Sequence, residues 1–487
     1  MIVKTDQDAI KSYLEDSSNL KGGWAEEAVF PQSPEEISEI LIRASRAGRP
    51  VTVSGGGTGA VGARVPRGGI VLSLERMNQD IDISRDVSQG IWLARCQAGV
   101  LVEDLKKKAE SEGLFYACHP TEKTAALGGT VATNASGARS LRYGPTRRFV
   151  RALKVVLSAG DILYIKRGSR FISKKDSTVV LKSGRKILIP IPSYKMPAVK
   201  NSAGYYAKDG MDLIDLFVGQ EGTLCVIAEV SLELEKRPEE IFSCFAFFSS
   251  EEKSWSFSQD ALALDPLSME YFDHNAIVML MSKGLNIPRY AKAAIFFEKD
   301  TKSGKTDEAI EEWRALFKEY GAREEDAWAE IGEGESGKFI ELRHSIPDMV
   351  NARIRRAGCE KISIDSALPR DRFPEMMNFY VESLGKALLE HVIFGHIGEC
   401  HVHVNILPQD EEVAAAKALA LQFVRKAVLL GGTVSAEHGI GKIKHAYLEE
   451  LYGREGVLEM ARIKKALDPA WILGPDNIFP AKLAEEL

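Results

Sequence analysis

The sequence lacks the features that mark several special classes of protein. Its six cysteines are scattered with no CxxC pair, so neither an iron–sulfur cluster nor a thiolate zinc site is encoded locally. No apolar run approaches the roughly 18 residues that a membrane helix needs. Acidic residues outnumber basic ones only slightly, 69 against 63. We therefore expect no transmembrane segment and no nucleic-acid partner.

The N-terminal segment also lacks the signals of a targeting peptide. Residues 1–20 contain neither a basic n-region nor an apolar h-region, and they are too acidic for a transit peptide. We therefore expect a cytoplasmic protein.

The 487 residues suffice for two large domains or about three ordinary ones. Before residue 238, short strand patterns alternate with glycine-rich loops, and after it longer helical patterns alternate with strands. We predict an α+β fold with one domain over 1–238 and a second over 239–480. A last segment, about 434–487, is expected to pack back toward the first domain.

The first candidate ligand loop is 54–59, which follows a short strand pattern. The spacing of glycines over 57–62 matches the GxGxxG of a Rossmann dinucleotide site. However, Pro66 and a second strand pattern follow where that fold requires a helix. What remains is a loop whose backbone N–H groups can approach a diphosphate without obstruction by Cβ atoms. An ordinary tight loop is the alternative.

Two further stretches, 127–137 and 219–224, are similarly poor in large side chains. A backbone this bare can lie against a large flat or extended ligand, and Asn134 can supply hydrogen bonds to it. Three such stretches in the first half of the chain are difficult to explain as turns alone.

Histidine is concentrated in the second half, where six of the nine lie between residues 391 and 445. His401, His403 and Asn405 alternate with apolar residues and would share one face of a strand. Imidazoles aligned in this way, with a carboxylate nearby, suit zinc or manganese. Solvent-facing histidines on a half-buried strand are the alternative.

An adjacent acid and imidazole, Glu437 and His438, lie in a glycine-flanked turn. Glu437 can ligate a metal. His438 can act as a general base, because an imidazole with a pKa of about 6.5 is largely neutral near pH 7. Arg343 is a candidate partner for a substrate carboxylate, although the residue taken by itself is more typical of a solvated helix position.

These segments, in this order, resemble the FAD-linked 2-hydroxy-acid dehydrogenases of the vanillyl-alcohol-oxidase-type flavoprotein superfamily. That group includes D-lactate dehydrogenases, D-2-hydroxyglutarate dehydrogenases and the flavin subunit of glycolate oxidase. The likeness runs from about residue 30 to Pro480 and rests on the FAD loops, a GHxGDGNxHxN-like segment at 395–405, and SAEHGIGK at 435–442. It implies a two-lobed FAD-binding domain followed by a substrate domain of antiparallel sheet and helices.

The resemblance also implies roles for single residues. His396, His403 and Glu437 fall on the family's metal ligands and His438 on its base. Arg343 and Asn405 fall on the residues that contact the substrate. The implied FAD contacts are Ser54, Gly55, Gly56, Gly57, Thr58, Gly59, Pro120, Gly128, Gly129, Asn134, Gly137, Tyr143, Gly222 and Ile227.

Two departures from the family pattern concern the metal and the substrate. Where relatives have GDGN, this chain has Gly-Glu-Cys-His at 398–401, so His401 could compete for the ion. The lysine that 2-hydroxyglutarate enzymes carry two residues before Asp365 is Ser363 here, with Lys361 two residues upstream. Recognition of a distal carboxylate therefore stays open.

The function implied is FAD-dependent oxidation of a small D-2-hydroxy acid, such as D-lactate or glycolate, by metal-assisted hydride transfer. Because the chain encodes no cluster of its own, its electrons must pass to an electron-transfer flavoprotein, an iron–sulfur subunit, a cytochrome or a quinone. The alternatives are a flavin-dependent transferase like alkylglycerone-phosphate synthase and a non-catalytic FAD-binding subunit of a larger complex.

Overall fold

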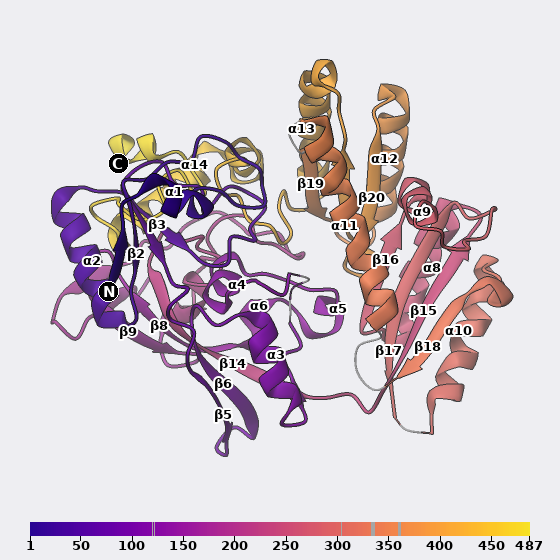
Figure 1. The fold of residues 1–487 in the computed structure, drawn as a ribbon, viewed down its shortest axis with the longest axis horizontal. Coiled ribbons are helices and arrows are strands. Elements are labelled where there is room, and N and C mark those ends of the chain that lie inside the picture. Colours follow the sequence, from indigo (N-terminus) through magenta and orange to yellow (C-terminus); the bar gives the residue numbers. More distant parts are fainter. Residues whose placement is uncertain (119, 121, 303, 333–336, 359–361) are drawn as a thin grey trace.

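The chain forms two units that lie side by side and are joined by the link from β14 (Val226–Lys236) to β15 (Glu240–Phe248) (Figure 1). Its mixed content of helix and sheet confirms the predicted α+β class. Lys361, named above, lies outside the described residues. The computed structural model describes residues 1–118, 120, 122–302, 304–332, 337–358 and 362–487.

The first unit is built on two sheets. Their strands are β1 (Ile2–Lys4), β2 (Glu27–Phe30), β3 (Val51–Ser54), β4 (Ile70–Ser73), β5 (Ile81–Asp86), β6 (Ile91–Gln97), β8 (Val150–Val156), β9 (Ile162–Lys166) and β14. One sheet has the order β1-β2-β4-β3 with its last three strands parallel. The other is antiparallel, with the order β5-β6-β14-β8-β9.

Short elements complete this unit. They are α1 (Gln7–Ile10), α2 (Pro34–Ala47), α3 (Val102–Glu110), β7 (Leu114–Phe115), α4 (Leu127–Thr133), α5 (Ser140–Tyr143), α6 (Thr146–Phe149), β10 (Phe171–Ile172), β11 (Thr178–Val180), β12 (Lys186–Leu188), β13 (Met211–Asp212) and α7 (Leu213–Leu216). As the sequence predicted, no helix follows the first glycine loop, because residues 55–69 form turns and bends before β4 begins.

Helix α4 was not predicted from the sequence. Gly128 and Gly129 are poor helix formers, which favours an irregular backbone there. The helix forms because Leu127 and Val131, one turn apart, are both fully buried. Tertiary packing therefore overrides local propensity at this place.

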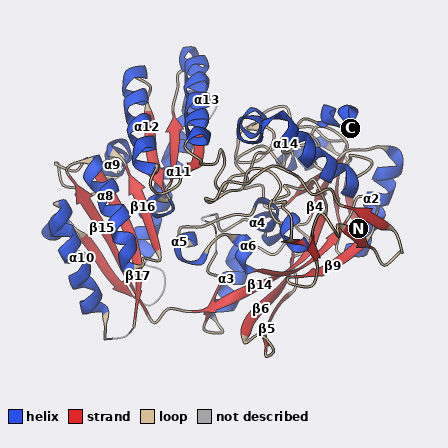
Figure 2. Cartoon of the chain, turned by 180° about the vertical axis from the view of Figure 1, so that it is seen from behind, coloured by secondary structure: helices blue, strands red, loops and turns tan. Residues whose placement is uncertain are grey.

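The second unit holds a seven-stranded antiparallel sheet of order β18-β15-β17-β16-β20-β21-β19 (Figure 2). The added strands are β16 (Ser268–Phe272), β17 (Ala293–Thr301), β18 (Trp328–Gly332), β19 (Ile362–Ala367), β20 (His391–Gly395) and β21 (His401–Ile406). Its helices are α8 (Glu251–Ala261), α9 (His274–Met281), α10 (Thr306–Tyr320), α11 (Gly337–Ala357), α12 (Phe373–Ala387) and α13 (Val413–Leu429). Helices α8, α10, α12 and α13 share a core with one face of the sheet, whereas α9 and α11 share a core with the other.

The C-terminal segment returns to the first unit. Helix α14 (His445–Leu467) lies among the N-terminal elements in Figure 1, where its yellow ribbon is next to indigo strands. Val51 N donates to Ile472 O at 2.7 Å, and α14 contributes to the core of the first unit. The division at residue 238 stays a prediction, which these separate cores support. Among the described helices, none combines the length and apolar character needed to cross a bilayer.

Candidate active site

A cavity of about 720 Å³ is lined by residues of both units. Its walls bring together segments that are more than 300 residues apart in the chain. From the first unit come Gly55, Gly56, Gly57, Thr58, Gly59, Pro120, Gly128, Gly129, Gly222 and Ile227. From the later part of the chain come Arg343, His396, His403, Asn405, Glu437 and His438. Most residues singled out from the sequence therefore face one space.

Four of the predicted cofactor residues do not line this cavity: Ser54, Asn134, Gly137 and Tyr143. Asn134 ends helix α4 in a left-handed conformation, and its side-chain oxygen accepts a hydrogen bond from Arg147 N at 3.0 Å. Ser54 Oγ accepts a hydrogen bond from Arg64 Nε at 2.6 Å. These contacts stabilise the loops without facing the cavity. A sequence motif does not distinguish such a residue from one that contacts the ligand.

The glycines of the first unit fall into two groups. A Cβ atom on Gly56 would lie 2.3 Å from Thr124 O, and one on Gly128 would lie 2.6 Å from Ala98 Cβ, so close backbone packing requires both glycines. Gly129 also lines the cavity, yet a Cβ there would meet nothing within 4 Å. Its absent side chain leaves space that a ligand can use.

Glu221 connects this glycine-rich wall to the turn that carries Glu437 and His438. Its carboxylate accepts hydrogen bonds from Ile440 N at 2.8 Å and Gly441 N at 2.7 Å. Burial raises the pKa of Glu221 to about 7, although these two hydrogen bonds act in the opposite direction. The sequence analysis missed this residue, whose signal was an acid between glycines in an apolar segment.

Strand β21 places three of the predicted polar residues on one face. His401, His403 and Asn405 alternate with buried apolar residues, which confirms the predicted strand and its alternation. The neighbouring strand β19 pairs Asp365 with His403 and Ser363 with Asn405. The polar face of both strands therefore carries side chains toward the same place.

Three side chains that can ligate a metal, two imidazoles and one carboxylate, lie close together at the cavity. His396 Nε2 and His403 Nε2 each lie 3.2 Å from Glu437 Oε1. In a tetrahedral zinc site with bonds of about 2.0–2.1 Å, the donor atoms lie roughly 3.3–3.4 Å apart. These residues therefore fit a divalent ion in donor type, and both imidazole–carboxylate distances are close to that spacing.

A second layer of charge orients His396. Its Nδ1 lies 2.7 Å from Glu270 Oε1, and the other oxygen of Glu270 lies 3.1 Å from Arg343 Nε. Burial alone would raise the pKa of Glu270, but Arg343 and His396 lower it to about 2. Burial likewise opposes the cationic form of His396, yet Glu270 and Glu437 raise its pKa to about 9. An ion at Nε2 must therefore displace a proton.

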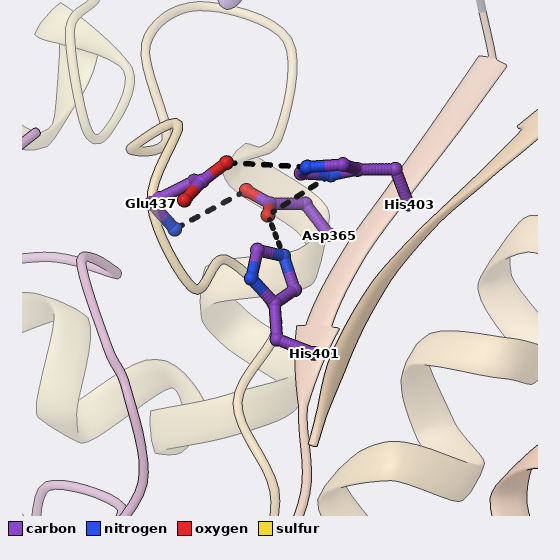
Figure 3. Close-up of side chains that lie close together, drawn as sticks. All are labelled: Asp365, His401, His403 and Glu437. Atoms are coloured by element: carbon purple, nitrogen blue, oxygen red, sulfur yellow. Dashed lines mark hydrogen bonds and ion pairs between the residues drawn. The ribbon is translucent and has the colours of Figure 1, made fainter. Parts of the chain in front are cut away.

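Asp365 is the centre of a second cluster (Figure 3), in which its side chain lies with those of His401, His403 and Glu437. The ligating atoms of these four residues lie within 4.8 Å of one another, so they form a rival donor set. Asp365, however, already accepts from His401 Nε2 at 2.7 Å and lies 3.0 Å from His438 Nδ1. The contacts favour His396, His403 and Glu437 as ligands, with Asp365 orienting the imidazoles around them.

His401 is fully buried, and this burial lowers its pKa to about 3. The neutral ring donates its Nε2 hydrogen to Asp365, so this nitrogen has no lone pair for a metal. Its Nδ1, however, has no hydrogen-bond partner within the described chain, so the ligand role that the altered 398–401 segment left open stays a prediction.

His438 lines the cavity and is held by Asp365. Asp365 Oδ2 lies 3.0 Å from both Nδ1 and the backbone N of His438, which directs Nε2 away from Asp365. Burial would raise the pKa of Asp365, but His438 and Lys444 hold it well below its usual range.

The buried Asn405 Nδ2 has no hydrogen-bond partner within the described chain. It is therefore a donor available to a molecule in the cavity.

The sequence analysis missed three charged residues of this centre. Glu270 was detectable as an acid inside an otherwise apolar strand, and Asp365 appeared only as a landmark for Ser363. Lys200, which lies 2.9 Å from Glu437 Oε2, comes from a loop of the first unit and had no local signal.

The fold and the cavity define a protein of two units that share one ligand-sized cavity. The family described as "FAD binding domain" matches residues 25–166, and that described as "FAD linked oxidases, C-terminal domain" matches residues 237–478. The chain belongs to this family of FAD-linked oxidoreductases, and FAD is its cofactor. The resemblance noted in the sequence is thereby confirmed.

Named relatives extend over nearly the whole chain. The glycolate oxidase subunit GlcD of Bacillus subtilis is 29% identical over 93% of this chain and 88% of its own length. A D-lactate dehydrogenase of Archaeoglobus fulgidus is 30% identical over 92% of this chain and 90% of its own. A solved alkyldihydroxyacetonephosphate synthase matches with a TM-score of 0.65 at 15% identity, covering 97% of this chain and 82% of that one. This last likeness concerns the fold alone.

Proposed function

We propose that the protein oxidises a small D-2-hydroxy acid, of the D-lactate or glycolate kind, to the 2-oxo acid. The observation that carries this proposal is the shared cavity, in which a bare glycine wall faces Arg343, Asn405 and His438. The names of two relatives, a D-lactate dehydrogenase and a glycolate oxidase subunit, support the substrate class.

The cofactor and the metal have separate places in this proposal. FAD bound along the glycine wall supplies the acceptor for two electrons. A divalent ion, zinc or manganese, would be held by His396, His403 and Glu437, where its charge would acidify the substrate hydroxyl as metals acidify water. The carboxylate–histidine pair of Glu270 and His396 supports this assignment, because such pairs orient metal-ligating imidazoles.

The residues of the cavity divide the remaining work. Arg343 binds the substrate carboxylate, for which a guanidinium is suited. Asn405 donates its unpaired Nδ2 hydrogen to the substrate. His438 removes the hydroxyl proton at Nε2, while Asp365 at its Nδ1 stabilises the resulting imidazolium. The hydrogen on Cα leaves with its electron pair, which completes the two-electron oxidation.

The electrons must then leave the protein. The five cysteines in the described part are buried and free, and no CxxC pair occurs in the sequence. We propose a cytoplasmic enzyme that transfers electrons to an electron-transfer flavoprotein, an iron–sulfur subunit, a cytochrome or a quinone.

A panel of D- and L-2-hydroxy acids added anaerobically to the FAD-loaded protein tests this function. We expect D-lactate or glycolate to bleach the flavin, chelation to abolish bleaching, and added zinc or manganese to restore it. If FAD binds and no 2-hydroxy acid bleaches it, the dehydrogenase assignment is wrong. The transferase and the non-catalytic subunit then become the better hypotheses. Bleaching that persists after complete removal of the metal would contradict the role of the metal but not the dehydrogenase assignment.

A further inference from the structure

Lys200 is a buried lysine whose ammonium group lies between two carboxylates of the candidate metal centre. Its Nζ lies 2.8 Å from Glu399 Oε2 and 2.9 Å from Glu437 Oε2, and its side chain is only 5% exposed. A lysine is rarely buried unless it is paired, because removing its charge from water is costly. This position therefore needs an explanation beyond packing.

The backbone around Lys200 is attached to the turn that carries Glu437. Ser202 N donates to Ser435 O at 2.9 Å, and Thr433 Oγ1 donates to Asn201 Oδ1 at 2.5 Å. The segment that follows Lys200 and the segment that precedes Glu437 are thus attached to each other by these two contacts. Lys200 belongs to the first unit and Glu399 to the second, so the lysine also links the two units at this point.

The two oxygens of Glu437 have different partners. Oε1 lies 3.2 Å from the Nε2 atoms of both His396 and His403, whereas Oε2 lies beside Lys200. A carboxylate free to rotate could present either oxygen, or both, to an ion. An ammonium group at Oε2 removes that freedom, because turning the carboxylate would break the ion pair.

Glu399 balances the charge of the lysine. A lone ammonium group at this distance would draw negative charge away from Glu437 and repel a cation nearby. With Glu399 as its second partner, Lys200 fixes the orientation of Glu437 without adding net charge. Glu399 occupies the position of the aspartate in the family pattern. The altered segment therefore retains a carboxylate, which is paired with Lys200.

We propose that Lys200, supported by Glu399, is the positioning residue that holds Glu437 as a one-oxygen ligand for the divalent ion. This inference rests on the proposed function, because it assumes that His396, His403 and Glu437 bind an ion. It adds a residue from the first unit to a metal site that otherwise belongs to later parts of the chain.

Metal affinity measured by equilibrium dialysis of the FAD-loaded protein tests this role. Zinc and manganese are used in turn, and the bound metal is quantified. We expect Lys200→Met to weaken binding by about 10–100-fold, the usual cost of losing a residue that orients a ligand. FAD occupancy should stay at the wild-type level. The matched control is Lys426→Met, which removes the same charge from an exposed pair with Glu375 and should leave metal affinity unchanged.

A second variant keeps the test decisive if Lys200→Met does not fold. Glu399→Gln retains the size of the side chain but leaves the lysine with Glu437 as its one carboxylate partner. We expect metal binding to weaken several-fold, because the uncompensated ammonium repels the cation. Unchanged metal affinity in either folded variant would overturn the role of Lys200 while leaving the proposed function intact. A wild-type protein that binds neither metal would overturn both the ligand set and this inference.

Discussion

The flavin side of the cavity and its ion side differ in what they offer a ligand. The flavin side presents backbone and space, with glycines at 55–57, 59, 128, 129 and 222. The ion side presents charged and polar side chains that hold one another through chains of ion pairs and hydrogen bonds, such as Arg343–Glu270–His396–Glu437. The flavin side is therefore defined by the absence of side chains, and the ion side by contacts between side chains.

This difference determines how each side responds to mutation. On the flavin side, one added methyl group either collides with the backbone, as at Gly56, or occupies ligand space, as at Gly129. On the ion side, the charged residues have partners that a substitution leaves behind, so the cost is electrostatic and extends along the chain of contacts. The flavin side should therefore lose ligand affinity when changed, whereas the ion side should lose chemistry or metal.

The largest expected effect is on the ion side, at His438. His438→Asn should lower turnover with the active 2-hydroxy acid by about 10²–10⁴-fold, because the general base is lost. FAD should remain bound, since the flavin wall is untouched. Steady-state turnover with a dye acceptor, together with the flavin absorbance of the purified variant, measures both quantities.

The matched control for His438 is His391→Asn. His391 belongs to the same histidine-rich region, but its Nδ1 faces Leu389 O rather than the cavity. This variant should keep wild-type turnover. A His438→Asn enzyme that retained more than about a tenth of wild-type turnover would show that another group accepts the proton.

The next largest effect separates ligand space from fold on the flavin side. Gly129→Ala should weaken FAD binding by about tenfold, which equals about 1.4 kcal/mol, because the new methyl group enters the cavity. The FAD-free protein should not lose stability, since alanine favours a helix more than glycine does. Fluorescence titration with FAD and the thermal midpoint of the FAD-free protein give these two values.

Gly385→Ala provides the comparison for that change. Gly385 also lies within a helix and also has nothing within 4 Å of an added Cβ, but it does not line the cavity. The FAD affinity of the Gly385→Ala variant should match that of the wild type. Equal FAD affinity in Gly129→Ala would mean that the flavin does not lie against α4.

The last expected effect is a change of stability with pH, and it concerns Glu221, which joins the two sides. Its pKa is raised from 4.5 to about 7 in the folded chain, so ionisation opposes folding. This cost is absent below about pH 4.5, grows as the pH rises, and is complete above about pH 7, where it is on the order of 3 kcal/mol.

Glu221→Gln removes that titration. Relative to the wild type, the variant should gain stability as the pH rises from about 5 to 8. Thermal midpoints of both FAD-loaded proteins across this range measure the difference. A constant difference would show that Glu221 does not change its protonation state over that interval.

Much of the architecture was predictable because periodicity and glycine loops are local signals. The alternation around His401 and His403 predicted a strand and its polar face, and Pro66 correctly argued against a Rossmann helix. Helix α4 was missed because its glycines favour irregular backbone and its stability comes from buried Leu127 and Val131. The predicted cofactor residues Ser54 and Asn134 carry motif signals, yet both accept hydrogen bonds from arginines of the protein itself.

The order of residues in the chain by itself determined which chemistry was present: glycine loops for a diphosphate, a face of imidazoles, and an acid beside a histidine in a turn. These follow from side-chain type and short-range spacing. Only the tertiary structure decided that Glu270 would hold His396, that Asp365 would direct His438, and that Lys200 would come from the first unit to face Glu437. The partners of a buried charge are set by how distant strands and loops pack together, and nothing in the neighbouring residues encodes that choice.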